Sequence, residues 1–205
     1  TATHFVPQVA EALVKAKNKG LVIPVVYNSS AYENVSTLNM LDGLVDVYLP
    51  DMKYIDSRLS AEYSKAPDYA DVAKAAIHEM VRQTRKPEFF IVDDELVKSG
   101  RVEAGIMKKG VIVRHLVLPG TTKDSKAVIK YLIDTYGDDI YISIMSQYTP
   151  FERLKKHPLL SRKVTRKEYN SVVDYAIDCG INNGFIQEGD VAEESFIPEF
   201  DYEGI

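Results

Sequence analysis

The sequence predicts an α/β protein built on a parallel sheet. Amphipathic helical segments alternate along the chain with short apolar runs rich in β-branched residues. Such alternation is typical of strand–helix units in a parallel sheet, either open or curled into part of a barrel. Length and composition agree, because 205 residues with 45% hydrophobic and 27% charged side chains suit one domain over residues 1–205.

Apolar spacing predicts the elements of the first half. A helix is expected over 5–19, and the apolar run 21–27 directly after it is typical of a buried parallel strand. A weaker helix over 33–41 precedes a second strand over 45–49. The next helix, over 69–84, carries its apolar residues on one stripe.

The second half opens with an interruption. Residues 88–110 break the alternation and are expected to form an excursion, such as a hairpin. Regular units then resume, and the last helix begins with a capping box between Thr165 and Glu168. The expected elements are a strand over 111–118, a helix over 123–136, a strand over 140–145, a helix over 165–180 and a final strand over 183–188.

Charge and cysteine content exclude several classes of protein. A net charge of −5 argues against a nucleic-acid binder, which needs a basic surplus to match phosphates. Because no run of about 18 apolar residues occurs, we expect no membrane span. The single cysteine, Cys179, excludes a disulfide within the chain and favours a reducing, cytoplasmic setting.

Polar side chains follow each expected strand. In parallel α/β folds ligands bind beyond the carboxyl ends of the strands, so these side chains are candidates for one site. Each alone has a plain alternative, because strand ends are turns and turns are polar. The candidates at strand ends are Asn28, Ser29, Ser30, Asp51, Lys53 and Gln147.

Three charged residues carry the most information. Asp51 and Lys53 are two positions apart, so both side chains can face the same space and orient a zwitterionic ligand, or can simply form an ion pair. Arg114 interrupts an apolar strand, so its charge needs a partner. That partner is either an acidic side chain or an anionic ligand such as a carboxylate, which a guanidinium binds with two hydrogen bonds.

Several segments together resemble one family. The resemblance covers nearly the whole chain and extends into the tail over 185–198. The segments are VVYNSSAY at 25–32, DVYLPDMKY at 46–54, VRHLVLPG at 113–120 and SIMSQY at 143–148. They resemble radical S-adenosylmethionine proteins related to pyruvate formate-lyase activating enzyme, within a branch of activase homologues.

The resemblance implies a partial (β/α) barrel of the radical S-adenosylmethionine type. It also implies a four-iron four-sulfur cluster that receives an electron from a reductant. The reduced cluster cleaves S-adenosylmethionine to methionine and a deoxyadenosyl radical. In activases this radical acts on a backbone glycine of a partner glycyl-radical enzyme or similar protein substrate.

The same resemblance assigns residues to the cofactor pocket. Asn28, Ser29 and Ser30, with Asp51 and Lys53, would line the S-adenosylmethionine site. By the same carry-over, Arg114 would face inward on the next strand. Gln147 would close the pocket, although better-known activases carry histidine there.

One departure from the family is large. The cluster motif CxxxCxxC is absent, and Cys179 alone cannot supply three thiolate ligands. We therefore expect a barrel truncated at its N-terminus, with the cluster segment upstream in a longer parent. The fragment itself is expected to bind neither cluster nor S-adenosylmethionine and to be inactive.

Two other functions stay open at this point. A lysine at a strand end can form a Schiff base, so a barrel lyase or aldolase using Lys53 is one alternative. The other is a relative without a cluster that binds a nucleotide or a partner protein.

Overall fold

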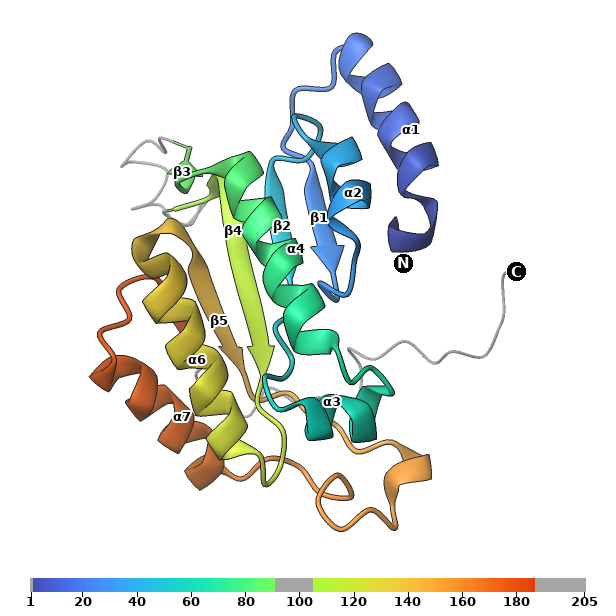
Figure 1. Ribbon diagram of the computed structural model, residues 1–205. Helices are drawn as coiled ribbons and strands as arrows, with labels where there is room; N and C mark the ends of the chain where they lie inside the picture. The colour runs from blue at the N-terminus through green and yellow to red at the C-terminus, as the bar shows by residue number, and fades with distance from the viewer. Residues whose placement is uncertain (1, 91–104, 187–205) are drawn as a thin grey trace.

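A computed structural model describes residues 2–90 and 105–186 of the chain. Its main sheet consists of five parallel strands in the order β1-β2-β4-β5-β6 (Figure 1). The strands are β1 (Val26–Ser29), β2 (Val47–Pro50), β4 (Met107–Leu116), β5 (Tyr141–Met145) and β6 (Gly184–Ile186). This spatial order follows the chain, as in a barrel built from successive strand–helix units, but the described strands leave the sheet open. The predicted fold class is confirmed.

The helices occur between the strands, as the apolar spacing predicts. Figure 1 shows α4 and α6 lying along one face of the sheet. The α-helices are α1 (Val6–Asn18), α2 (Val35–Leu38), α3 (Ser57–Ser64), α4 (Tyr69–Thr84), α6 (Thr122–Tyr136) and α7 (Arg166–Asp178). The bounds of α4 match the predicted range 69–84, because its buried stripe repeats at helical spacing over four turns.

The hydrophobic core lies between the sheet and these helices. On β4, Val111, Val113 and His115 are buried toward the helices, and the intervening Ile112 and Arg114 keep partial exposure on the opposite face. This alternation follows from the two-residue repeat of a strand. We call the side of the sheet that carries Arg114 the open face.

The capping box of α7 forms as predicted. The Thr165 hydroxyl accepts a hydrogen bond from the Glu168 backbone nitrogen at 3.2 Å, and Glu168 Oε2 accepts one from the Thr165 nitrogen at 2.9 Å. Glu168 also accepts hydrogen bonds from Arg162 and from the Gly120 nitrogen, so α7 is tied to the turn after β4.

Some predicted bounds were wrong. Strand β1 begins only at Val26, and Val22 and Ile23 are 89% and 68% exposed, so the run 21–25 is not strand, and within it Val25 packs against the core. The short helix α3 was not expected, because it carries few apolar residues. Strand β4 begins four residues earlier than expected, at Met107.

The predicted hairpin is present in part. Strand β3 (Glu88–Phe89) pairs antiparallel with β4, with Glu88 opposite Lys109. Residues 91–104, which would connect these strands, and the tail segments from 187 onward lie outside the described residues. In the described part of the chain, no helix has the length and apolar character needed to cross a membrane.

Candidate functional site

The candidate site lies where β2 ends beside β4. Asp51, one residue beyond β2, forms a parallel bridge with Arg114 on β4. The Met52 nitrogen donates to the Arg114 carbonyl at 2.9 Å and holds this register, and the Asp51 nitrogen donates to the Ser29 carbonyl on the β1 side, also at 2.9 Å. The backbone therefore brings an acidic and a basic side chain together on the open face.

The side chains form a compact charged group. Arg114 donates from Nε and Nη2 to Asp51 Oδ1 at 2.9 and 2.6 Å, and from Nη2 to Asn28 Oδ1 at 2.6 Å. The Lys53 ammonium lies 3.8 Å from Asp51 Oδ2. Side chains of Arg114 and Asp51 are 27% and 22% exposed, so the pair is partly buried yet reachable by a ligand. We call Asn28, Asp51, Lys53 and Arg114 the charged group.

The charged group has hydrogen-bond donors that are available to a ligand. Arg114 Nη1 makes no hydrogen bond within the described ranges, and the Lys53 side chain is 41% exposed. Two cations therefore share one carboxylate, which leaves a surplus positive charge at the mouth of the group. A ligand carboxylate fits beside these cations, and a ligand ammonium fits beside Asp51 Oδ2.

Tyr69, the first residue of α4, fixes the backbone that carries part of the charged group. Its hydroxyl lies 2.9 Å from the Ser30 carbonyl oxygen and 2.7 Å from that of Asp51, and it accepts a hydrogen bond from the Lys53 nitrogen at 3.1 Å. Burial holds the pKa of this hydroxyl well above its usual range, so it stays protonated and can donate. One buried phenol thus joins the turns that follow β1 and β2.

Replacing Tyr69 with phenylalanine is expected to lower the free energy of unfolding by about 1–2 kcal/mol, because buried backbone groups lose their partner. Amide hydrogen exchange should also accelerate at the Lys53 nitrogen. Urea unfolding and exchange measurements check both effects. Tyr63→Phe is the control, since the Tyr63 ring also packs against the core but its hydroxyl has no hydrogen bond within the described residues. Equal behaviour of the two variants would contradict the positioning role.

The remaining predicted residues lie differently. Ser29 is buried on the helix side, where its hydroxyl bonds to Glu33 and accepts from the Ala31 nitrogen. Ser30 is half-buried and contributes its carbonyl to Tyr69. Gln147 is exposed beyond β5, with its amide nitrogen 3.6 Å from Met145 Sδ. In the described structure no side-chain hydrogen bond joins Ser29 or Gln147 to the charged group; Ser29 meets it through its carbonyl, which accepts from the Asp51 nitrogen at 2.9 Å.

Sequence reasoning missed two residues of this region. Ser143 lies opposite Arg114 in the pairing of β4 with β5, on the same face of the sheet. The alternation of partly exposed Tyr141, Ser143 and Met145 is a signal that could have found it. Tyr69 offered no signal, because an aromatic residue at the start of a helix is usually a packing residue.

No family model matches the chain. Over 154 residues it is 29% identical to an uncharacterized protein of Methanocaldococcus jannaschii. That alignment covers 75% of this chain and 38% of the relative, so the chain spans less than two-fifths of the protein it matches.

Among solved structures, the chain is similar to a domain of pyruvate-formate lyase-activating enzyme from Bacteroides vulgatus ATCC 8482. The TM-score is 0.57, the sequence identity is 11%, and the match covers 91% of this chain and 94% of that domain. At this identity the likeness concerns the fold. The chain therefore has the α/β fold of an activating-enzyme domain, with a parallel sheet and its charged group at the carboxyl ends of the strands.

Proposed function

We propose that this chain is the later part of a radical S-adenosylmethionine enzyme of activase type. In this proposal residues 1–205 are one domain, the C-terminal part of its partial barrel. The observation that carries the proposal is the charged group, in which Arg114 and Lys53 flank Asp51 at the strand ends of an activase-like fold. The methionine end of S-adenosylmethionine is a zwitterion that matches this arrangement.

Each residue has a defined part in this proposal. Arg114 Nη1 and the Lys53 ammonium bind the ligand carboxylate, and Asp51 Oδ2 binds its ammonium. Asn28 holds the guanidinium from the other side through its 2.6 Å contact with Nη2. Ser29, Ser30 and Gln147 remain predicted cofactor-pocket residues; Ser30 contributes through the backbone position that Tyr69 fixes.

The iron–sulfur cluster does not fit this chain. A radical S-adenosylmethionine cluster needs three thiolates, whereas the sequence has one cysteine, Cys179, which lies at the end of α7. Within the described ranges no group of three or more histidine, cysteine, aspartate or glutamate residues could hold a metal ion. We therefore assign the cluster to another part of the parent protein, together with its reductant and a glycyl-radical enzyme or other protein substrate. A cytoplasmic setting is part of the same proposal.

The lyase or aldolase alternative gains no support from Lys53. Schiff-base catalysis needs a neutral amine, usually in a desolvated setting. Lys53 is 41% exposed and its Nζ lies 3.8 Å from Asp51 Oδ2, so its setting is not desolvated.

The test uses the parent protein and its coding region. We expect a CxxxCxxC motif upstream of Thr1. Anaerobic reconstitution with iron and sulfide, followed by reduction, should then give methionine and 5′-deoxyadenosine from S-adenosylmethionine, measured by mass spectrometry. A parent without the motif would contradict the enzyme proposal. Binding of S-adenosylmethionine without cleavage would instead identify a binding protein.

A further inference from the structure

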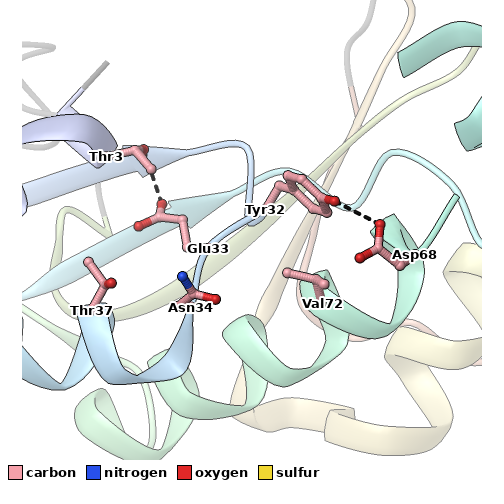
Figure 2. A pocket seen from close by; sticks show the side chains of 7 residues that line it. All are labelled: Thr3, Tyr32, Glu33, Asn34, Thr37, Asp68 and Val72. Carbon is pink, nitrogen blue, oxygen red and sulfur yellow. Dashed lines mark hydrogen bonds between the residues drawn. The ribbon is translucent and has the colours of Figure 1, made fainter. Parts of the chain in front are cut away.

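A pocket separate from the charged group lies between the turn after β1 and the start of α4. It has a volume of about 280 Å³ and is lined by side chains of the short helical turn Ala2–Phe5, the turn after β1, α2 and the start of α4 (Figure 2). Its lining residues are Thr3, Tyr32, Glu33, Asn34, Thr37, Asp68 and Val72. Two of the seven are acidic and none is basic, so the pocket is electronegative.

Glu33 is the chemically unusual residue of this pocket. It is 5% exposed, yet no lysine, arginine or histidine of the described structure forms an ion pair with it. It accepts hydrogen bonds from the Tyr27 hydroxyl at 3.0 Å, the Thr3 hydroxyl at 3.3 Å and the Ser29 hydroxyl. Buried carboxylates are normally paired with a cation, because neutral donors leave the charge uncompensated.

The hydrogen bonds leave room for one more donor. A carboxylate has about four acceptor positions. The Thr3 and Ser29 hydroxyls occupy Oε1, and the Tyr27 hydroxyl takes one position on Oε2. One position on Oε2 is therefore available to a donor that enters the pocket.

The opposite wall suits an organic cation. Asp68 Oδ1 accepts a hydrogen bond from the Tyr32 hydroxyl at 2.7 Å, and the Tyr32 ring stacks on Tyr69 with ring centroids 5.9 Å apart. Val72 adds an apolar surface. Aromatic rings attract ammonium and guanidinium groups, and an apolar wall accommodates the carbon chain that carries them.

The size of the pocket decides between an organic cation and a bare ion. Its volume of about 280 Å³ is large beside the roughly 30 Å³ that one water molecule takes in the liquid. Within the described residues no group of three or more histidine, cysteine, aspartate or glutamate residues could hold a metal ion, so the lining of the pocket favours an organic cation.

We propose that this pocket binds a small organic cation whose primary ammonium or guanidinium group pairs with Glu33. The aliphatic part of the ligand lies against Tyr32 and Val72. Where the ligand has a second donor group, Asp68 accepts a hydrogen bond from it. This site is separate from the charged group and does not depend on S-adenosylmethionine.

Calorimetry with the 205-residue chain tests the proposal, at constant ionic strength. The probes are agmatine, which carries both cationic groups, n-butylammonium and methylguanidinium. Neutral n-butanol and potassium ion are the controls. We expect agmatine to bind more tightly than either control, and the two single-group probes show which cation is preferred. Binding of potassium alone, or equal binding of n-butanol, would overturn the proposal.

Three variants locate the site. Glu33→Gln should weaken agmatine binding at least tenfold, and Asp134→Asn, a surface acid paired with Lys130, should leave it unchanged. Thr37→Lys places an ammonium in the pocket and should abolish agmatine binding while raising the melting temperature. Thr37→Lys keeps the test valid if Glu33→Gln fails to fold. Wild-type affinity in Thr37→Lys would show that agmatine binds elsewhere.

Discussion

Replacing Arg114 with alanine is expected to lower the affinity of the parent protein for S-adenosylmethionine at least 100-fold. The variant loses the guanidinium that would bind the ligand carboxylate, and it leaves Asp51 partly buried without its partner. A 100-fold loss corresponds to about 2.7 kcal/mol of binding free energy. Calorimetric titration of the parent checks this value.

The conservative variant separates geometry from charge. Arg114→Lys keeps a positive charge but cannot reach Asp51 and Asn28 at the same time, so we expect an intermediate loss of affinity. Arg58→Ala is the matched control, because that side chain is 88% exposed and, among the residues that the structure describes, forms its ion pair with Asp56. If Arg114→Ala folds and binds within threefold of wild type, the charged group is not the ligand site.

The second large effect is a loss of stability at acid pH caused by His115. This residue is 1% exposed, its Nδ1 lies 2.8 Å from the Met52 carbonyl oxygen, and its Nε2 has no hydrogen-bond partner in the described structure. Nδ1 therefore carries the proton. Burial lowers the pKa of His115 to about 4, against 6.5 when unperturbed.

The direction of the pH effect follows from these two values. Between pH 6.5 and 4 the unfolded chain binds the proton and the folded chain does not, so protonation favours unfolding. The free energy of unfolding is unaffected by His115 above about pH 6.5. It falls as the pH drops toward 4, by about 3 kcal/mol in total.

His115→Asn tests this assignment, because an amide can still donate to the Met52 carbonyl but does not titrate. Urea unfolding between pH 4 and 7 should show a shallower pH dependence for this variant than for wild type. The exposed His78 provides the control, and His78→Gln should keep the wild-type slope. An unchanged slope in His115→Asn would assign the acid sensitivity to other groups.

Much of the fold could be predicted, because its helices and central strands bury regular stripes. Helix α4 and the capping box of α7 follow from local spacing alone. The predicted start of the first strand was wrong because β-branched residues at Val22 and Ile23 indicate extended backbone but not burial. Strand bounds depend on the pairing with a neighbour, and here the register of β1 with β2 begins with Val26 opposite Val47.

The candidate site was predictable in part for a related reason. Asp51 and Arg114 were each suspected, and the structure brings them together because β2 and β4 are parallel neighbours. Ser29 was grouped with Asn28, but β1 continues through both, so successive side chains point to opposite faces. Tyr69 was missed, since its contacts come from segments far apart in the sequence, and Glu33 was missed because the sequence does not show that it is buried.

The pairing of Asp51 with Arg114 makes the site sensitive to the deletion of a single residue in β4. A strand turns every side chain to the other face when it slips by one position. A deletion of one residue between Val111 and Arg114 would point the guanidinium into the helix layer and a valine or histidine into solvent. Natural variants of this protein should therefore vary in composition around the site while keeping the length of β4 constant.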